Sequence, residues 1–174
     1  MKSPTIATLE KMNACKTGID WFIQNKKSTI EKTIENADKE GLECANWYIV
    51  RKLTDISKVK YAIYAAEKVL HIFEEKYPDD KRPADAIKAA RKYVENPTKE
   101  NKNSAYSAAY AAYAAAATYA ADAAAAAAYS SAYSAYAAAD AAADAAANAA
   151  VGANHIETIK SIIHYGIKII QEVV

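Results

Sequence analysis

The side chains with the most regular spacing in this chain are two rows of tyrosines in an alanine-rich stretch. Each row steps by four and then by three residues: Tyr106, Tyr110 and Tyr113 form the first row, and Tyr129, Tyr133 and Tyr136 form the second. Such steps place side chains on one face of an α-helix. Asp140 and Asp144 extend the second row at four-residue intervals. We predict that these residues bind a partner, because tyrosine supplies a large, rigid contact area with a polar tip.

The same tyrosine rows also have a purely structural interpretation. Faces made of alanine let helices approach closely, and a tyrosine row is then the large half of a large-to-small interface. The two interpretations can divide the tyrosines between them. A channel that stacks nucleic-acid bases needs basic residues beside the aromatic rings. No Lys or Arg occurs between Lys102 and Lys160, and this absence disfavours nucleic acid as the partner.

The other residue types give little support for catalysis or for metal binding. The histidines His71, His155 and His164 lack the short spacings typical of metal ligands. We expect Cys15 and Cys44 to be buried and reduced, because a disulfide, a zinc site or a catalytic cysteine would need more partners than the sequence offers. With 4 glycines, the chain has no phosphate-binding loop and no nucleophile motif. We therefore predict a protein that is not an enzyme and has no cofactor and no metal site.

The composition indicates an all-α protein. A chain of 174 residues can bury a core as a single domain, and its few glycines and prolines and the lack of alternating apolar residues favour helices. The net charge is +1, divided into +4 over residues 1–102 and −3 over residues 103–174, so neither part has the dense basic stripe of a general nucleic-acid binder. The first residues lack the apolar core of a signal peptide, and this predicts a cytoplasmic location.

Residues 1–96 read as a series of conventional amphipathic helices. In the clearest pattern, from Ser57 to Lys76, apolar residues step by four and three, as expected for one helix packed against others. Ser28 and Glu31 have the spacing of a capping box, which predicts a helix that begins there and ends at Gly41.

Residues 97–153 hold the alanine- and tyrosine-rich segment. Its 50 residues from Ser104 to Ala153 include 31 alanines, and alanine has the highest helix propensity. One rod of that length would span roughly 75 Å, so we predict a hairpin of two helices. The turn is expected near residues 129–131, or alternatively near Asp122. A membrane span is disfavoured because the aspartates of this segment would be costly in a bilayer.

Residues 154–174 carry isoleucines at helical spacing, which predicts a helix that closes the core. Gly166 within it suggests the close approach of a neighbouring backbone. The whole chain is then a single all-helical domain, residues 1–174. We expect a multi-helix bundle or a short helical-repeat superhelix with close-packed alanine-rich helices.

The stretch AEKVLHIFEEKYPDDKRPADAIKAARKY, residues 66–93, together with the alanine-rich tail, resembles a family of bacterial and phage-borne sequences, the Imm-5-like putative immunity proteins. The positions that carry the resemblance are Val69, Leu70, Phe73, Glu74, Pro78, Asp80, Arg82, Pro83, Ala86, Ile87, Ala89, Ala90 and Arg91. We interpret Pro78, Asp80, Arg82, Pro83 and Arg91 as structural residues of a corner between two helices. ANWYIVR, residues 45–51, is similar to a segment of phage-associated members. The alanine-rich tails of similar sequences often carry His and Arg among the alanines. In this chain Tyr, Ser and Asp take those places.

The resemblance implies a small cytosolic protein that neutralises a toxin by binding it. Our leading hypothesis is thus a non-enzymatic binding protein that occupies a protein partner in a bacterial host cell, as an immunity factor or a phage counter-defence factor. A second hypothesis is a small-molecule sponge that holds a nucleotide signal between the tyrosine rows. A third is a structural protein of a phage that assembles into homo-oligomers through its alanine-rich helices.

Overall fold

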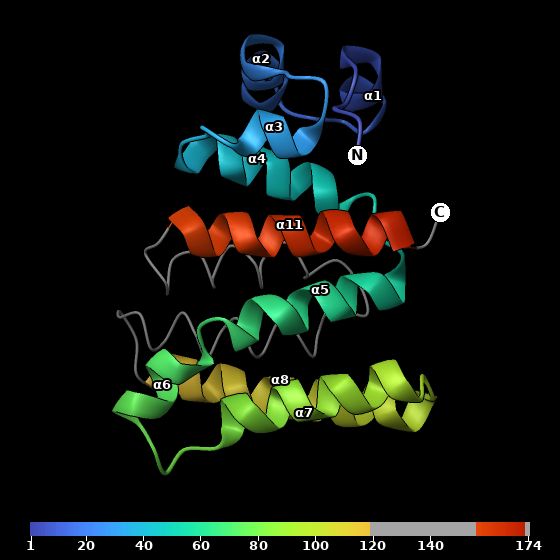
Figure 1. Cartoon of the computed structure of the whole chain (residues 1–174). Coiled ribbons are helices and arrows are strands. Elements are labelled where there is room, and N and C mark those ends of the chain that lie inside the picture. Colours follow the sequence, from blue (N-terminus) through green and yellow to red (C-terminus); the bar gives the residue numbers. More distant parts are fainter. Residues whose placement is uncertain (119–155, 173–174) are drawn as a thin grey trace.

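The regular structure is helical in the part of the chain that the structure describes (Figure 1). The computed structural model describes residues 1–118 and 156–172. Within these ranges there are helices and no named strand, which confirms the all-α prediction. The helices are α1 (Ile6–Lys11), α2 (Lys16–Asn25), α3 (Ile30–Ile34), α4 (Lys39–Val50), α5 (Asp55–Glu67), α6 (Leu70–Lys76), α7 (Arg82–Glu95), α8 (Lys99–Thr118) and α11 (Ile156–Glu172).

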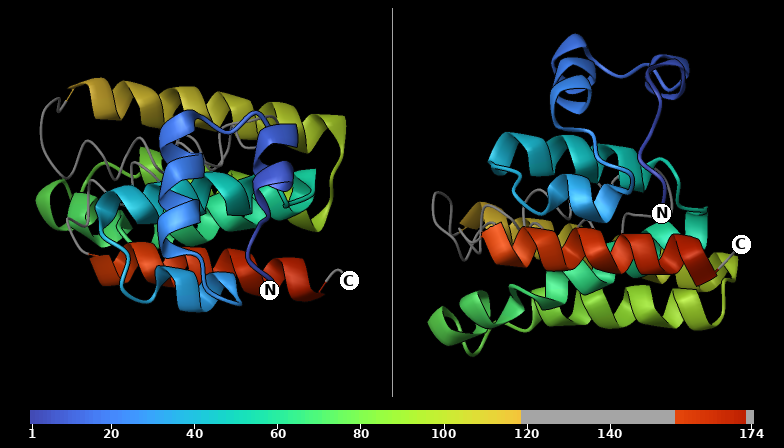
Figure 2. Two further views of the ribbon diagram at one scale, coloured as in Figure 1. Left: turned by 90° about the horizontal axis from the view of Figure 1, so that it is seen from above. Right: turned by 45° about the horizontal axis from the view of Figure 1, so that its top comes forward.

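Four of the helices lie side by side in the order α4, α11, α5, α7 (Figure 1). Helix α8 packs along α7, and α1, α2 and α3 lie on the other side of α4 (Figures 1 and 2). Only the short segment of residues 51–54 joins α4 to α5 in the sequence. Even so, the late helix α11 lies between them, so it has a neighbour on each flank.

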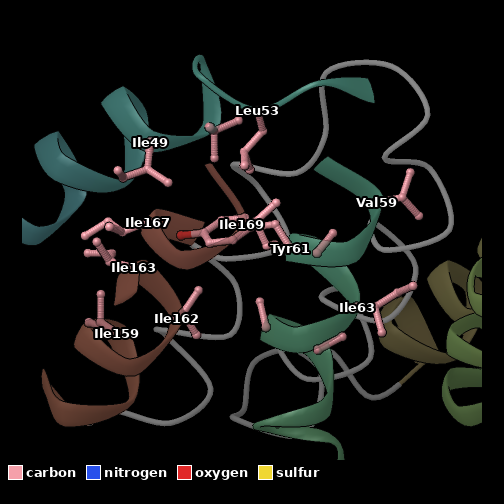
Figure 3. Close-up of a cluster of buried hydrophobic side chains, with 14 of the residues drawn as sticks. Ile49, Leu53, Val59, Tyr61, Ile63, Ile159, Ile162, Ile163, Ile167 and Ile169 are labelled. Carbon is pink, nitrogen blue, oxygen red and sulfur yellow. The ribbon is translucent and has the colours of Figure 1, made fainter. Parts of the chain in front are cut away.

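Helix α11 is buried on a broad surface because it is covered from both sides. Figure 3 shows its isoleucines between the side chains of α4 and those of α5. The buried isoleucines are Ile159, Ile162, Ile163, Ile167 and Ile169. Ile156, in the first turn, is 45% exposed. Burial of apolar side chains on this scale is the main favourable contribution to folding, so α11 is part of the core, as the sequence predicted.

Gly166 is the point of closest packing between α11 and its neighbours. A methyl group placed on this residue would lie 2.5 Å from Cγ2 of Ile49 in α4 and 2.7 Å from Cε2 of Tyr61 in α5. The fully buried Tyr61 ring passes this glycine, and its hydroxyl donates a hydrogen bond of 2.6 Å to Oδ1 of Asn46 in α4. The expected close approach therefore exists, but to side chains of two helices instead of to a neighbouring backbone.

The single helix predicted for Ser57 to Lys76 is wrong, because the structure divides it into α5 and α6. The backbone changes direction at Val69, whose φ and ψ are −123° and −6°. Its amide donates to the carbonyl of Ala66, three residues back, at 3.1 Å. Valine is β-branched and has a modest helix propensity. Apolar spacing continues through the break, so the periodicity did not reveal it.

The capping prediction near residue 28 is also wrong. Thr29 caps α3, accepting from the amide of Lys32 at 3.4 Å, and α3 ends at Ile34. Gly41 lies in the first turn of α4 and does not end a helix. A methyl group on Gly41 would lie 2.3 Å from Cζ2 of Trp21, so this glycine makes room for an indole ring.

We predict that Gly166→Ala destabilises the fold by about 1–3 kcal/mol, because the new methyl group overlaps Ile49 and Tyr61. Urea unfolding followed by circular dichroism measures the change. Gly18→Ala is the matched control, since a methyl group there would meet its nearest neighbours at 3.6 Å and 3.8 Å, which are ordinary contacts. The control should be neutral or slightly stabilising within its helix. Equal losses in the two variants would contradict the role given to Gly166.

We predict that Tyr61→Phe lowers the free energy of unfolding by about 0.5–1.5 kcal/mol, because it removes the donor that bonds to Asn46 while keeping the ring. Tyr64→Phe is the comparison: its hydroxyl contacts Ser161 in a half-buried position, where water can replace the bond. A larger loss in Tyr64→Phe than in Tyr61→Phe would show that the buried hydroxyl does not tie α5 to α4.

Candidate functional site

The first tyrosine row lies on α8, where Tyr106 is half-buried and Lys102 Nζ stands 5.8 Å from its ring centroid. Ala105, Ala109 and Ala112 are buried instead. These alanines have the same steps as the tyrosine row but are one residue earlier, about 100° around the helix. The alanine row is therefore the one that faces the core. The side chains of the other two tyrosines of this row, Tyr110 and Tyr113, lie outside the described part of the chain.

The second tyrosine row, with its two aspartates, also lies outside the described residues, and so does the predicted turn. The residues concerned are Tyr129, Tyr133, Tyr136, Asp140 and Asp144. Their role in binding a partner stays a prediction.

The corner between α6 and α7 is organised by an ion pair between Asp80 and Arg82. Nη2 of Arg82 donates to Oδ2 of Asp80 at 2.6 Å, and its Nε donates to Oδ1 at 2.9 Å. The backbone amide of Arg82 also donates to Oδ1, at 3.1 Å. This last bond satisfies an amide at the start of α7, where Lys81 makes no side-chain cap. A two-point charged pair of this kind fixes the geometry of the turn.

The prolines of the corner have different surroundings. Pro83 is buried in the first turn of α7, where its fixed φ suits a helix start. Pro78 is exposed and, with Asp80 and Arg82, lines an open hollow of about 470 Å³. Lys76 Nζ lies 5.5 Å from the ring centroid of Tyr77 beside it.

A second set of tyrosines comes together where α5 meets α11. The rings of Tyr64 and Tyr165 are stacked, with centroids 4.1 Å apart and planes inclined by 16°. The Tyr64 hydroxyl and Ser161 Oγ form a hydrogen bond of 3.2 Å, and Lys68 Nζ lies 4.9 Å from the Tyr64 ring centroid. Stacking and the cation both hold the rings in place.

The last motif residue, Arg91, lies beside this stack. From α7 its guanidinium donates two hydrogen bonds to Oε1 of Glu67 at the end of α5. The charges of Glu67 and Arg91 also act on the pKa of Tyr165, which Glu67 raises and Arg91 lowers. We name Tyr64, Lys68, Tyr165, Glu67 and Arg91 together the tyrosine patch.

The two stacked tyrosines have different acidities. Burial raises the pKa of Tyr64, but hydrogen bonds with Ser161 and Lys68 and the charge of Lys68 outweigh it, so the pKa lies below its usual value. For Tyr165, burial and then the negative charges of Glu172 and Glu67 hold the pKa above its usual value. The site thus favours negative charge at one phenol and disfavours it at the other.

Sequence reasoning missed the tyrosine patch, apart from Arg91. Tyr64 and Ser161 are 97 residues apart in the chain. Their positions within two separate helices carry no signal that the helices are neighbours. The one available clue was the motif, which singled out Arg91 without naming its surroundings.

The cysteines differ from the expectation of two buried thiols. Cys15 is exposed, and Cys44 is half-buried. Both line a pocket of about 280 Å³ between the first two helices and α4. Burial, then the charges of Cys15, Glu40, Glu43 and Asp38, raise the pKa of Cys44 to about 11. This thiol is therefore protonated at neutral pH.

Within residues 1–118 and 156–172, no group of three or more His, Cys, Asp or Glu side chains is placed to hold a metal ion. In the same part of the chain, no helix is long and apolar enough to cross a membrane.

The corner and the tyrosine patch fall in the part of the chain that matches a known protein family. The family model described as "Imm-5 like putative immunity protein" matches residues 51–171. The chain belongs to this family. The resemblance seen in residues 66–93 is thereby confirmed. Searches among curated proteins and among solved structures gave no match.

The match to the Imm-5-like family covers one part of the chain and leaves the N-terminal part unmatched. The match begins at Arg51, so α1 to α4 lie before it. All five residues of the tyrosine patch lie within it. A surface that members of the family share would be found in the matched part, whereas the pocket with the two cysteines belongs to the unmatched part.

We predict that Lys68→Met raises the pKa of Tyr64, because the variant loses both the positive charge and the hydrogen bond that hold it down. Titration of tyrosines labelled with ¹³C at Cζ, followed by NMR, measures the change. Lys60→Met removes an exposed lysine from the same helix, α5, and should leave the pKa of Tyr64 unchanged. Equal pKa values in wild type and Lys68→Met would contradict the proposed cause.

Proposed function

We propose that the chain is a non-enzymatic immunity protein that neutralises a toxin, or another antagonistic protein, by binding to it in the cytoplasm of a bacterial cell. Membership of the Imm-5-like family supports the immunity role. The tyrosine patch is the observation that carries the binding mechanism. It gathers side chains from α5, α7 and α11 into one place.

The composition of the tyrosine patch suits a protein interface. Tyrosine and arginine are the residue types enriched where interfaces gain most of their binding energy. The stack of Tyr64 on Tyr165 is already ordered, so little side-chain entropy is lost when a partner covers it. The patch is also well supported, since Tyr165 is next to Gly166, which lies in the core.

The charges of the patch indicate what the partner offers. Lys68 and Arg91 are exposed cations, and the carboxylate of Glu67 already binds the Arg91 guanidinium. A partner surface with acidic side chains around an apolar or aromatic centre complements this arrangement. Charge complementarity of this kind speeds association and selects the partner. The predicted tyrosine row on α8, with Tyr106 half-buried beside Lys102, supports a second contact.

A counter-defence factor of a phage would use the same mechanism, because it too acts by occupying a host protein. The identity of the captured partner distinguishes the two roles. A toxin indicates immunity, and a component of a bacterial defence system indicates counter-defence.

We predict that Arg91→Glu and Lys68→Glu each weaken binding of the partner by about 10- to 100-fold, because each places a carboxylate against an acidic surface. The partner is first captured by cross-linking from the natural host, and affinities are then measured by calorimetry. Lys26→Glu is the matched control: it reverses an exposed lysine in the N-terminal part, away from the patch, and should bind like the wild type. A triple change of Tyr106, Tyr110 and Tyr113 to Ala tests the α8 row.

Binding alone does not establish neutralisation, so growth is the second measurement. The captured partner is expressed in a bacterial test strain with and without the chain. We expect inhibition by the partner alone and recovery with the wild-type chain. A partner that is harmless by itself, or wild-type affinity in both charge-reversal variants, would overturn the proposal. Capture of no protein, with binding of a nucleotide instead, would support the sponge hypothesis.

A further inference from the structure

The pocket in the N-terminal part of the chain brings the two cysteines together. Cys15 precedes α2 and Cys44 lies in α4, yet both line the same hollow. Gly18 lies beneath them: a methyl group placed on it would be 3.6 Å from Sγ of Cys15 and 3.8 Å from Sγ of Cys44. The two sulfur atoms are therefore no farther apart than the sum of those distances.

The two thiols have different surroundings. Cys15 is the N-cap residue of α2, and its Sγ accepts a hydrogen bond of 3.4 Å from the amide of Gly18. This thiol is exposed. Cys44 is half-buried and held by its helix. Both sulfurs thus line the same pocket, one from the N-cap position of α2 and the other from within α4.

The remaining walls of the pocket favour a soft cation. Leu9, Phe22 and Trp47 give the pocket an apolar lining beside the two sulfurs. Glu40 and Glu43 lie at the same pocket and give it negative charge. A cation between the sulfurs gains from that charge.

We propose that Cys15 and Cys44 form a two-coordinate site for a soft, thiophilic metal ion of the d¹⁰ class, such as Cu(I) or Ag(I). Soft thiolate ligands select such ions. The upper bound on the separation of the two sulfurs allows one ion to bind both of them. Each thiol loses its proton when it binds the metal, so loading one ion releases up to two protons. The site needs no third protein ligand.

The test uses Ag(I), which does not change its oxidation state under the conditions of the experiment. The full chain is reduced, desalted without oxygen and shown to hold two free thiols. It is then dialysed against Ag(I) with excess glutathione, which competes for isolated thiols, and the bound silver is measured by mass spectrometry. We expect one ion per wild-type chain. Cys15→Ser and Cys44→Ser should each bind roughly 10²- to 10⁴-fold more weakly, because the second thiol acts at high effective concentration.

Thr17→Val is the matched control, because Thr17 lines the same pocket without a sulfur. It should bind silver like the wild type. Circular dichroism melting shows whether each variant is folded; if Cys44→Ser is not, the exposed position of Cys15 makes Cys15→Ser the deciding variant. Wild-type affinity no higher than that of either single variant would overturn the proposal, and so would two independent ions per chain. The neutralisation experiment above uses neither cysteine, so the two proposals fail separately.

Discussion

The absence of a side chain at Gly166 is the constraint on which the arrangement of helices depends. It lets the Tyr61 ring pass close to α11 and place its hydroxyl on Asn46. One tyrosine thus connects α5 to α4 across a helix that separates them. The Tyr61 side chain is fully buried, so its pKa is raised and its hydroxyl would be costly without a partner. The hydrogen bond therefore links α5 to α4, while the surrounding isoleucines supply most of the stabilisation.

The tyrosine patch lies at the surface end of the same contact between α5 and α11. Tyr64 follows Tyr61 by one helical turn, and Tyr165 precedes Gly166, so the stacked pair lies where the core reaches the surface. The two tyrosines of the stack are held in place because they are attached to residues of the packed core. This differs from a row of tyrosines on an isolated helix face, which would have to be ordered by the partner itself.

The sequence was a good guide to which segments are helical and a poor guide to their neighbours. Helical spacing of isoleucines identified α11, and the proline-containing motif identified the corner between α6 and α7, because these features depend on residues close in the chain. The break at Val69 and the position of Gly41 in a first turn were missed, since apolar spacing does not report backbone direction or the approach of a distant indole. The pairing of Tyr64 with Tyr165 could be predicted only by knowing that α5 and α11 are neighbours. That contact depends on the fit of the Tyr61 ring against Gly166. The same holds for the cysteines, whose shared pocket depends on the packing of α2 on α4.

The place of α11 between α4 and α5 also has a consequence for biosynthesis. The ribosome makes roughly 5–20 residues per second, so on the order of 10 s separates the end of α5 from the start of α11. During that interval α11 is not yet available to cover the apolar sides of α4 and α5 that it contacts in the folded chain. Contacts across so many residues form slowly, and unfinished chains of this kind attract chaperones or one another. The synthesis of α11 thus determines how long the apolar surfaces of the nascent protein stay exposed to other molecules.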